Sequence, residues 1–155
     1  MSNKIWEFEC PWDKTQLLNE FDASSASTFS EYNTEWKKTW ELGSYGMGVK
    51  NHFYENNPDF NPRAYVGYYL QPAGTSIKIH TDTQCLSRVN VRLSGYDETL
   101  VIGGEEVTYE CALINVSEHE HYVDPILEDR LLFSVCFVDT SFEDAKNFLE
   151  TYSYP

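Results

Sequence analysis

Alternating apolar and polar residues between positions 64 and 138 predict a series of short β-strands. The clearest alternation covers residues 87–93, where valine and leucine at odd positions would face a core and Arg88, Asn90 and Arg92 would face the other side. Gly103-Gly104 separates two apolar stretches, 99–102 and 105–109, and is typical of a two-residue hairpin turn. Further strands are expected at 64–70, 76–80, 111–116 and 131–138. Seven or more short strands with frequent turns indicate an antiparallel sandwich or jelly roll.

The N-terminal part, about 11–43, follows a helical pattern instead. Asp13 and Gln16 have the spacing of a capping box, and Trp12 and Leu17 lie at the positions of a hydrophobic staple. A second helix is expected from about Thr28 to Gly43, because large aromatic residues repeat at helical spacing: Phe29, Tyr32, Trp36 and Trp40. This stripe is interpreted as core packing of a helix on the sheet.

Two further segments complete the expected organisation. Residues 43–62 are rich in Gly, Asn and Pro and predict a loop, whose aromatic residues make it a candidate lid over a substrate: Tyr45, His52, Phe53 and Tyr54. A last helix is expected at about 141–151. No internal repeat or linker separates helices from strands, so the 155 residues are interpreted as one α+β domain with a jelly-roll core at about 64–138.

The amino-acid composition limits the partners and the location that are expected for this protein. With 11 Lys+Arg against 25 Asp+Glu, the formal net charge is -14, which argues against nucleic acid or an anionic membrane as a partner. The first residues have no apolar stretch typical of a secretory signal, so a cytoplasmic protein is expected. The cysteines are scattered without a CxxC pair and are expected to be free thiols: Cys10, Cys85, Cys111 and Cys136.

The residues best suited to chemistry begin at the end of a predicted strand, with His80-Thr81-Asp82. Residues two apart on a strand project to the same face, so His80 and Asp82 can offer a nitrogen and an oxygen to one cation. A third ligand would come from His119 or His121 in the turn before the last strand. Two histidines and one carboxylate form the facial arrangement of non-haem Fe(II) sites, and zinc would also accept them.

Arg130 stands at the start of the last predicted strand, in a chain that is poor in cations. A salt bridge to a nearby carboxylate, Glu128 or Asp129, would explain it without any function. A guanidinium also suits bidentate binding of a small dicarboxylate. Arg88 and Arg92 on a neighbouring strand would add positive charge, so a locally positive pocket within an acidic protein is expected.

The order and spacing of these motifs resemble the Fe(II)/2-oxoglutarate-dependent oxygenases, most closely the aspartyl/asparaginyl β-hydroxylase and prolyl-hydroxylase-like branch. The resemblance covers about 64–138 and rests on a strand at 65–70, His80-Thr81-Asp82, residues 88–91, His121-Tyr122-Val123 and Arg130. The family fold is a double-stranded β-helix, which is a form of jelly roll. It therefore agrees with the fold expected from the alternation alone.

The resemblance implies a role for each matching position. His80, Asp82 and His121 match the iron ligands, and Arg130 matches the residue that holds the distal carboxylate of 2-oxoglutarate. Arg88 and Asn90 would lie near the other end of this cosubstrate.

The chain departs from the family pattern at one position and leaves a choice at another. The family often has Ser or Thr two residues after the arginine, and this sequence has Leu132 there. His119 competes with His121 for the third ligand position; the following Tyr122-Val123 favours His121, because the family has a His-x-Val pattern.

The implied activity is hydroxylation of a C–H bond with Fe(II), O2 and 2-oxoglutarate, with release of succinate and CO2. A free amino acid, a peptide side chain, a nucleobase or a small metabolite would all suit the motif as substrate. Two alternatives remain open. One is a cupin-like metalloenzyme without 2-oxoglutarate, which has no need of Arg130; the other is a non-catalytic jelly-roll binding module with His80 and Asp82 on its surface. The oligomeric state is not predicted.

Overall fold

The computed structural model describes residues 3–28, 36–55, 64–95 and 99–155. In these parts the strands and helices occur in the order β1 (Ile5–Glu7), α1 (Lys14–Glu20), a 3-10 helix (Ala23–Ser25), β2 (Ser27–Thr28), β3 (Lys37–Thr39), α2 (Ser44–Glu55), β4 (Ala64–Gln71), β5 (Ile77–His80), β6 (Ser87–Ser94), β7 (Leu100–Ile102), β8 (Glu105–Val107), β9 (Cys111–Ile114), β10 (His121–Val123), β11 (Arg130–Phe137) and α3 (Phe142–Thr151). None of the helices in the described parts is long and apolar enough to cross a bilayer.

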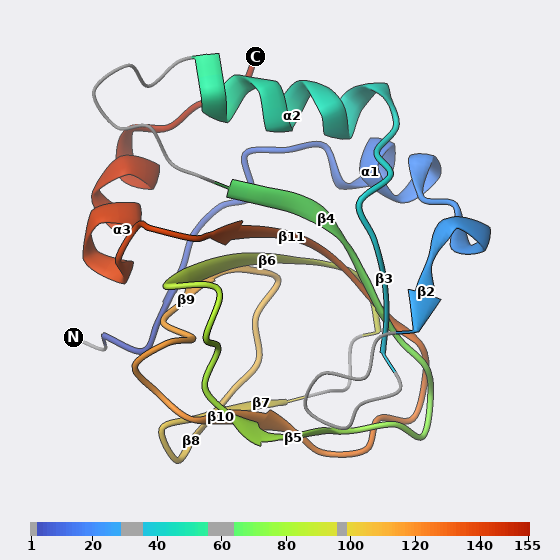
Figure 1. Ribbon diagram of the computed structural model, residues 1–155, viewed down its shortest axis with the longest axis vertical. Coiled ribbons are helices and arrows are strands. Elements are labelled where there is room, and N and C mark those ends of the chain that lie inside the picture. Colours follow the sequence, from blue (N-terminus) through green and yellow to red (C-terminus); the bar gives the residue numbers. More distant parts are fainter. Residues whose placement is uncertain (1–2, 29–35, 56–63, 96–98) are drawn as a thin grey trace.

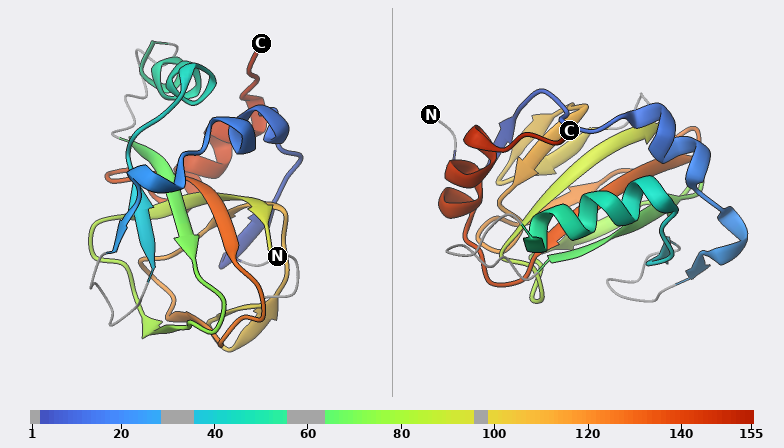
Figure 2. Two further views of the ribbon diagram at one scale, coloured as in Figure 1. Left: turned by 90° about the vertical axis from the view of Figure 1, so that its right-hand side faces the viewer. Right: turned by 90° about the horizontal axis from the view of Figure 1, so that it is seen from above.

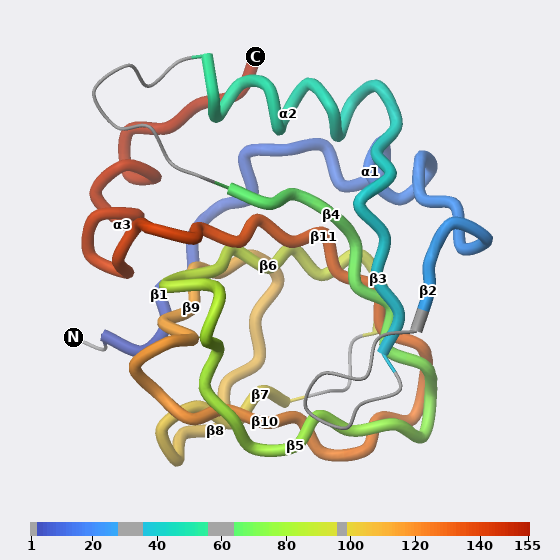
Figure 3. Tube along the Cα trace, viewed as in Figure 1, coloured from blue at the N-terminus to red at the C-terminus, as the bar shows by residue number. Residues whose placement is uncertain are grey.

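Two antiparallel sheets face each other, and the helices cover the outer face of the larger one (Figures 1 and 2). The larger sheet has the strand order β1-β9-β6-β11-β4-β3-β2, and the smaller has the order β5-β10-β7-β8. The trace in Figure 3 follows the chain as it passes repeatedly between the two sheets. This is the double-stranded β-helix, or jelly roll, with added helices, and the predicted fold class is confirmed.

Strand β6 shows how the alternation sorts side chains between two environments. Val89 and Val91 are fully buried in the core between the larger sheet and the helices. Arg88 and Asn90, which alternate with them, face the space between the two sheets and line a cavity there. The predicted hairpin also forms between β7 and β8, where its two glycines take positive φ angles of 53° and 82°.

The predicted start of the first helix is confirmed in detail. Asp13 caps α1, and its side chain accepts hydrogen bonds from the backbone N–H groups of Thr15 and Gln16. Trp12 and Leu17 are both buried in the core between the larger sheet and the helices, where a hydrophobic staple would place them. The C-terminal helix α3 is capped by Ser141, within the range expected for it.

The expected helix at about 28–43 is wrong in the parts that the structure describes; Phe29 and Tyr32 lie outside them. Strand β3 pairs with β4, and Trp36 and Trp40 flank it. A spacing of four places two side chains on one side of a strand as well as of a helix, so the aromatic pair did not distinguish them. Trp36 and Trp40 also line the cavity between the sheets, so the interpretation as plain core packing is corrected too.

The expected loop at 43–62 is also wrong, because most of it up to residue 55 is helix α2; residues 56–62 lie outside the described parts. Contacts distant in sequence stabilise this glycine-rich helix. The Glu20 carboxylate accepts hydrogen bonds from two backbone N–H groups in its first turn, and Val49 and Phe53 are fully buried. Helix α2 covers the outer face of the larger sheet (Figure 1), on the side away from the cavity, so the suggested lid is not supported.

The expectation of four free thiols is corrected as well. Cys85 and Cys136 form a disulfide, whereas Cys10 and Cys111 are free. The bond joins the segment after β5 to strand β11, which are 51 residues apart in the chain. Such a pairing has no sequence signature, because it depends on the pairing of β6 with β11, which brings Cys85, two residues before β6, beside Cys136.

Thiol counting checks this pairing. In protein isolated in air and denatured without reductant, we expect iodoacetamide to label two of the four cysteines, and peptide mass spectrometry should locate the label on Cys10 and Cys111. Reduction before labelling should make all four react. Four labelled cysteines without reductant would contradict the disulfide.

Candidate metal centre and adjoining cavity

A cavity of about 770 Å³ lies between the two sheets. Its size falls within the range of small-molecule sites. Strands β3, β4, β6 and β11 of the larger sheet and β5 and β10 of the smaller one contribute to its wall. The six residues to which the resemblance assigns a role at the metal or at 2-oxoglutarate all line it: His80, Asp82, Arg88, Asn90, His121 and Arg130.

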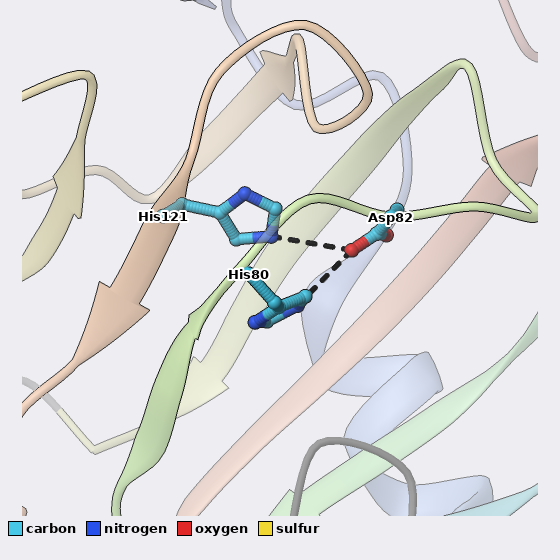
Figure 4. A group of neighbouring side chains, drawn as sticks. All are labelled: His80, Asp82 and His121. Atoms are coloured by element: carbon cyan, nitrogen blue, oxygen red, sulfur yellow. Dashed lines mark hydrogen bonds and ion pairs between the residues drawn. The ribbon is translucent and has the colours of Figure 1, made fainter.

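Three potential metal ligands meet at one end of the cavity (Figure 4). His80 ends β5 and His121 begins β10, and the two residues are direct partners in the antiparallel pairing of these strands. Asp82 follows β5, and its backbone N–H donates to the carbonyl of Val116. Its Oδ1 lies 3.1 Å from Nε2 of His80 and 3.2 Å from Nε2 of His121. The three ligand atoms all lie within 4.8 Å of one another.

Each imidazole ring is oriented by a hydrogen bond from its Nδ1 to the backbone carbonyl two residues earlier. Nδ1 of His80 lies 2.7 Å from the carbonyl oxygen of Lys78, and Nδ1 of His121 lies 3.0 Å from that of His119. A carbonyl oxygen only accepts hydrogen bonds, so each ring keeps a proton on Nδ1. In the neutral rings the lone pair of each Nε2 therefore points to the shared Asp82 oxygen.

This donor set fits a metal ion. Two imidazole lone pairs and a carboxylate oxygen directed at one point repel one another unless a positive species, a proton or a metal cation, lies between them. Neutral histidines whose other nitrogen donates to a carbonyl are the usual protein ligands of zinc and iron. Two histidines and one carboxylate leave coordination positions open, as in non-haem Fe(II) sites.

The geometry also distinguishes the two candidate histidines of the turn. His121 is the first residue of β10 and faces Asp82, whereas His119 is outside the ligand group. His119 contributes its backbone carbonyl, which holds the ring of His121. The two residues are two apart, so alternation alone could not separate them.

Asp82 remains ionised in this environment. Burial disfavours its charge, but where a proton lies between the Asp82 oxygen and Nε2 of the imidazoles, the hydrogen bonds from His121 and His80, together with the charge of Arg88, outweigh burial and hold the pKa of Asp82 well below its usual range. Nη2 of Arg88 lies 3.4 Å from Oδ2 of Asp82 and 3.0 Å from Sγ of Cys85. Burial opposes the charge of Arg88 as well, but Tyr69 and Asp82 raise its pKa above the usual value.

Another part of the cavity wall is built around Arg130, which is only 3% exposed. Its Nη1 donates to Oε1 of Gln71 at 3.3 Å, and its Nη2 donates to the hydroxyl of Tyr109 at 3.1 Å. The guanidinium also lies 5.6 Å from the centre of the Trp36 ring. Arg130 is therefore held in place with its charge on the cavity wall.

A chain of hydrogen bonds joins the two arginines. Arg88 Nη1 donates to Ser134 Oγ at 2.9 Å, and Ser134 donates to Oδ1 of Asn90 at 2.9 Å. Asn90 then donates to the hydroxyl of Tyr109 at 3.1 Å. Tyr109 accepts from both Asn90 and Arg130, so neither of these bonds uses its own proton. That proton can be donated to an anion bound in the cavity.

Sequence reasoning missed Tyr109 and Ser134. Ser134 could have been found from the alternation of β11, since it lies on the same side as Arg130. Tyr109 follows the β7–β8 hairpin, and nothing in its local sequence indicates a site. Arg92, which was expected to add charge to the pocket, is buried but is not among the residues that line the cavity.

Comparison with models of known protein families finds no match for this sequence, and comparison with curated proteins finds none either. The relation to the aspartyl/asparaginyl β-hydroxylase branch therefore remains a prediction.

Solved structures do match. A Pseudomonas putida prolyl-4-hydroxylase superposes with a TM-score of 0.60 at 12% identity, covering 81% of this chain and 83% of that one. A Trichoplax adhaerens prolyl hydroxylase, solved with a peptide of a hypoxia-inducible factor, gives 0.59 at 14% identity, covering 90% and 80%. A Thermotoga maritima protein described as a predicted oxalate decarboxylase gives 0.50 at 13% identity, covering 74% and 92%. At these identities the likeness establishes the fold: this chain has a double-stranded β-helix that it shares with the two prolyl hydroxylases and with the Thermotoga maritima protein.

Proposed function

We propose that this protein is an Fe(II)- and 2-oxoglutarate-dependent oxygenase that hydroxylates a small-molecule or peptide substrate. One observation carries the proposal: a single cavity combines the facial His80, Asp82 and His121 group with a buried cation, Arg130. A metal ion bound by two histidines and a carboxylate keeps positions for a chelating ligand. The fold shared with prolyl hydroxylases supports the same proposed function.

In this proposal the protein binds and orients, and bound iron supplies the oxidising chemistry with O2 and 2-oxoglutarate. His80, Asp82 and His121 hold the metal. Arg130 binds the distal carboxylate of 2-oxoglutarate with charge-assisted hydrogen bonds. Arg88 compensates the charge of Asp82 and fixes its orientation through the 3.4 Å ion pair.

Tyr109 can supply the hydroxyl group that is missing at Leu132. Leucine cannot provide the hydroxyl that many family members have at this position. In this chain the hydroxyl of Tyr109 touches Nη2 of Arg130 and has a proton to donate. We assign to Tyr109 the second hydrogen bond to the distal carboxylate, with Asn90 and Ser134 holding it in position.

Anaerobic titration tests the proposal. We expect Fe(II) to bind at one equivalent, and subsequent addition of 2-oxoglutarate should produce the weak visible charge-transfer band of a chelated iron site. Exposure to O2 should then form succinate slowly even without a substrate, as measured by mass spectrometry. Glutarate, which keeps both carboxylates but lacks the keto oxygen that completes the chelate, is the matched control and should give neither signal.

The alternatives give different results in the same titration. A cupin-like metalloenzyme would bind metal but would not distinguish 2-oxoglutarate from the control compound. A non-catalytic module would bind neither, and either outcome would refute the oxygenase. The formal charge of -14 supports a small-molecule or peptide partner over nucleic acid or an anionic membrane.

A further inference from the structure

One wall of the cavity is aromatic, and none of its residues is a proposed ligand of the metal or a proposed hydrogen-bond donor to 2-oxoglutarate. It is formed by strands β3 and β4, where alternate residues face the cavity: Trp36, Lys38 and Trp40 on β3 and its flanks, and Tyr65 and Tyr69 on β4. Trp36 is 5% exposed and packs beside Arg130. Trp40 and Tyr65, by contrast, are 45% and 50% exposed. The wall therefore runs from a buried end to an open end.

Trp40 packs closely against the backbone of β4. Its ring lies over Gly67, where a Cβ atom would be 2.5 Å from Cε3 of Trp40 and 2.6 Å from the carbonyl oxygen of Thr39. Tyr65 and Tyr69 flank the indole at ring-centre distances of 6.0 and 6.1 Å. The absence of a side chain at Gly67 thus creates the place for the indole. A large, fixed and half-exposed aromatic surface at a cavity is typical of a binding platform.

The charge of the cavity is opposite to that of the protein. Among the described lining residues the cations are Lys38, Arg88 and Arg130, and the only carboxylate is Asp82. Fe(II) and 2-oxoglutarate carry equal and opposite formal charges, so binding of both leaves the charge balance among these described side chains unchanged. Because the whole chain carries -14, such a local excess favours an anionic ligand.

Lys38 brings this charge to the platform. Its Nζ lies 5.5 Å from the centre of the Trp40 ring, toward the open end of the wall. The cation and the flat aromatic surface are therefore neighbours. A ligand that stacks on Trp40 can at the same time place an anionic group near Lys38.

Building on the proposed oxygenase function, we infer that Lys38 and Trp40 form the substrate subsite, and that the substrate is a small organic anion with a flat ring. The ring stacks on the indole between Tyr65 and Tyr69, and the carboxylate binds at Lys38. This arrangement leaves Arg130 to 2-oxoglutarate.

Ligand-observed NMR titration tests the subsite with simple probes. In protein loaded with Mn(II) and 2-oxoglutarate, we expect phenylacetate to bind about fivefold more tightly than the neutral phenylacetamide, and phenethylamine to bind least. Cyclohexylacetate, which has the charge but no flat ring, should bind more weakly than phenylacetate. Equal affinity for the acid and the amide, or no saturable binding of any probe, would overturn the inference.

Variants assign the effect to this wall. Lys38→Met should remove most of the preference for the acid, whereas Trp40→Leu should weaken all the ring-bearing probes. Gly67→Ala should act like Trp40→Leu, because it displaces the indole. Lys146→Met is the matched control, since Lys146 lies over Trp6 in a similar lysine–tryptophan pair away from the cavity, and it should change nothing. An unchanged preference in Lys38→Met would refute the subsite.

The design also separates this inference from the proposed function. Binding of 2-oxoglutarate to the Mn(II) protein is measured first, and its absence would count against the oxygenase. The probe titrations are then repeated with Mn(II) alone. If the protein binds 2-oxoglutarate but prefers the acid over the amide in neither titration, only the subsite is refuted.

Discussion

Replacing Asp82 with alanine is expected to abolish stoichiometric binding of Fe(II) or Mn(II), with a loss of affinity of more than about 100-fold. Asp82 supplies the carboxylate of the ligand group, and its Oδ1 is the atom that both histidine Nε2 atoms approach. Without it, two neutral imidazoles remain, and no negative charge offsets the cation. His80→Ala and His121→Ala should have similar effects. Isothermal titration with Mn(II) measures the loss without turnover.

The control for this result is His119→Ala. His119 lies two residues before His121, but it contributes a backbone carbonyl, and alanine retains that group. We therefore expect its metal affinity to stay within about threefold of the parent. Circular dichroism should verify that each variant is folded, because Asp82→Ala also leaves Arg88 without its ion-pair partner. If Asp82→Ala binds metal as the parent does, the ligand assignment is wrong.

Replacing Arg130 with alanine is expected to weaken binding of 2-oxoglutarate by roughly 1.5–3 kcal/mol, while metal affinity stays close to that of the parent. Arg130 is almost completely buried on the cavity wall, so its contact with a carboxylate would be shielded from water. Arg130→Lys should recover only part of the loss, because an ammonium cannot reproduce the planar two-pronged contact. Titration of the Mn(II)-loaded variants with 2-oxoglutarate provides the measurement.

Tyr109→Phe extends this test to the residue that the sequence did not reveal. It removes one neutral hydrogen-bond donor, so the expected loss is about 1 kcal/mol, smaller than that of Arg130→Ala. Unchanged 2-oxoglutarate affinity in Arg130→Ala would leave a metal-binding jelly roll without a carboxylate clamp. A loss of metal affinity in the same variant would instead indicate a general disturbance of the cavity.

Local patterns predicted those parts of the fold that local chemistry determines. The capping box at Asp13, the alternation of β6 and the Gly103-Gly104 turn each depend on a few neighbouring residues, and each formed as expected. His80 and Asp82 were placed together for the same reason. The i, i+2 spacing at a strand end is a local property.

The remaining features depend on partners that are distant in sequence. The segment around Trp36 and Trp40 became a strand because β4 pairs with it, and α2 formed around Gly46 because Glu20 bonds its first turn. Tyr109 reaches the site through contacts that the register of β6, β9 and β11 determines. No single-sequence pattern encodes such relations, since they arise from the packing of whole elements.

The division of the site between two sheets has a consequence for how ligand length is measured. The metal group belongs to the smaller sheet and the segment after it, whereas Arg130 belongs to the larger sheet. Backbone hydrogen bonds fix spacings within each sheet, but the gap between sheets is set by packed side chains such as Ile102, Ile114 and Val123. The width of that gap therefore sets the distance between iron and Arg130, and with it the length of the dicarboxylate that can bind to both. Substitutions in this hydrophobic layer can retune which chain length fits, without altering any residue that touches the ligand ends.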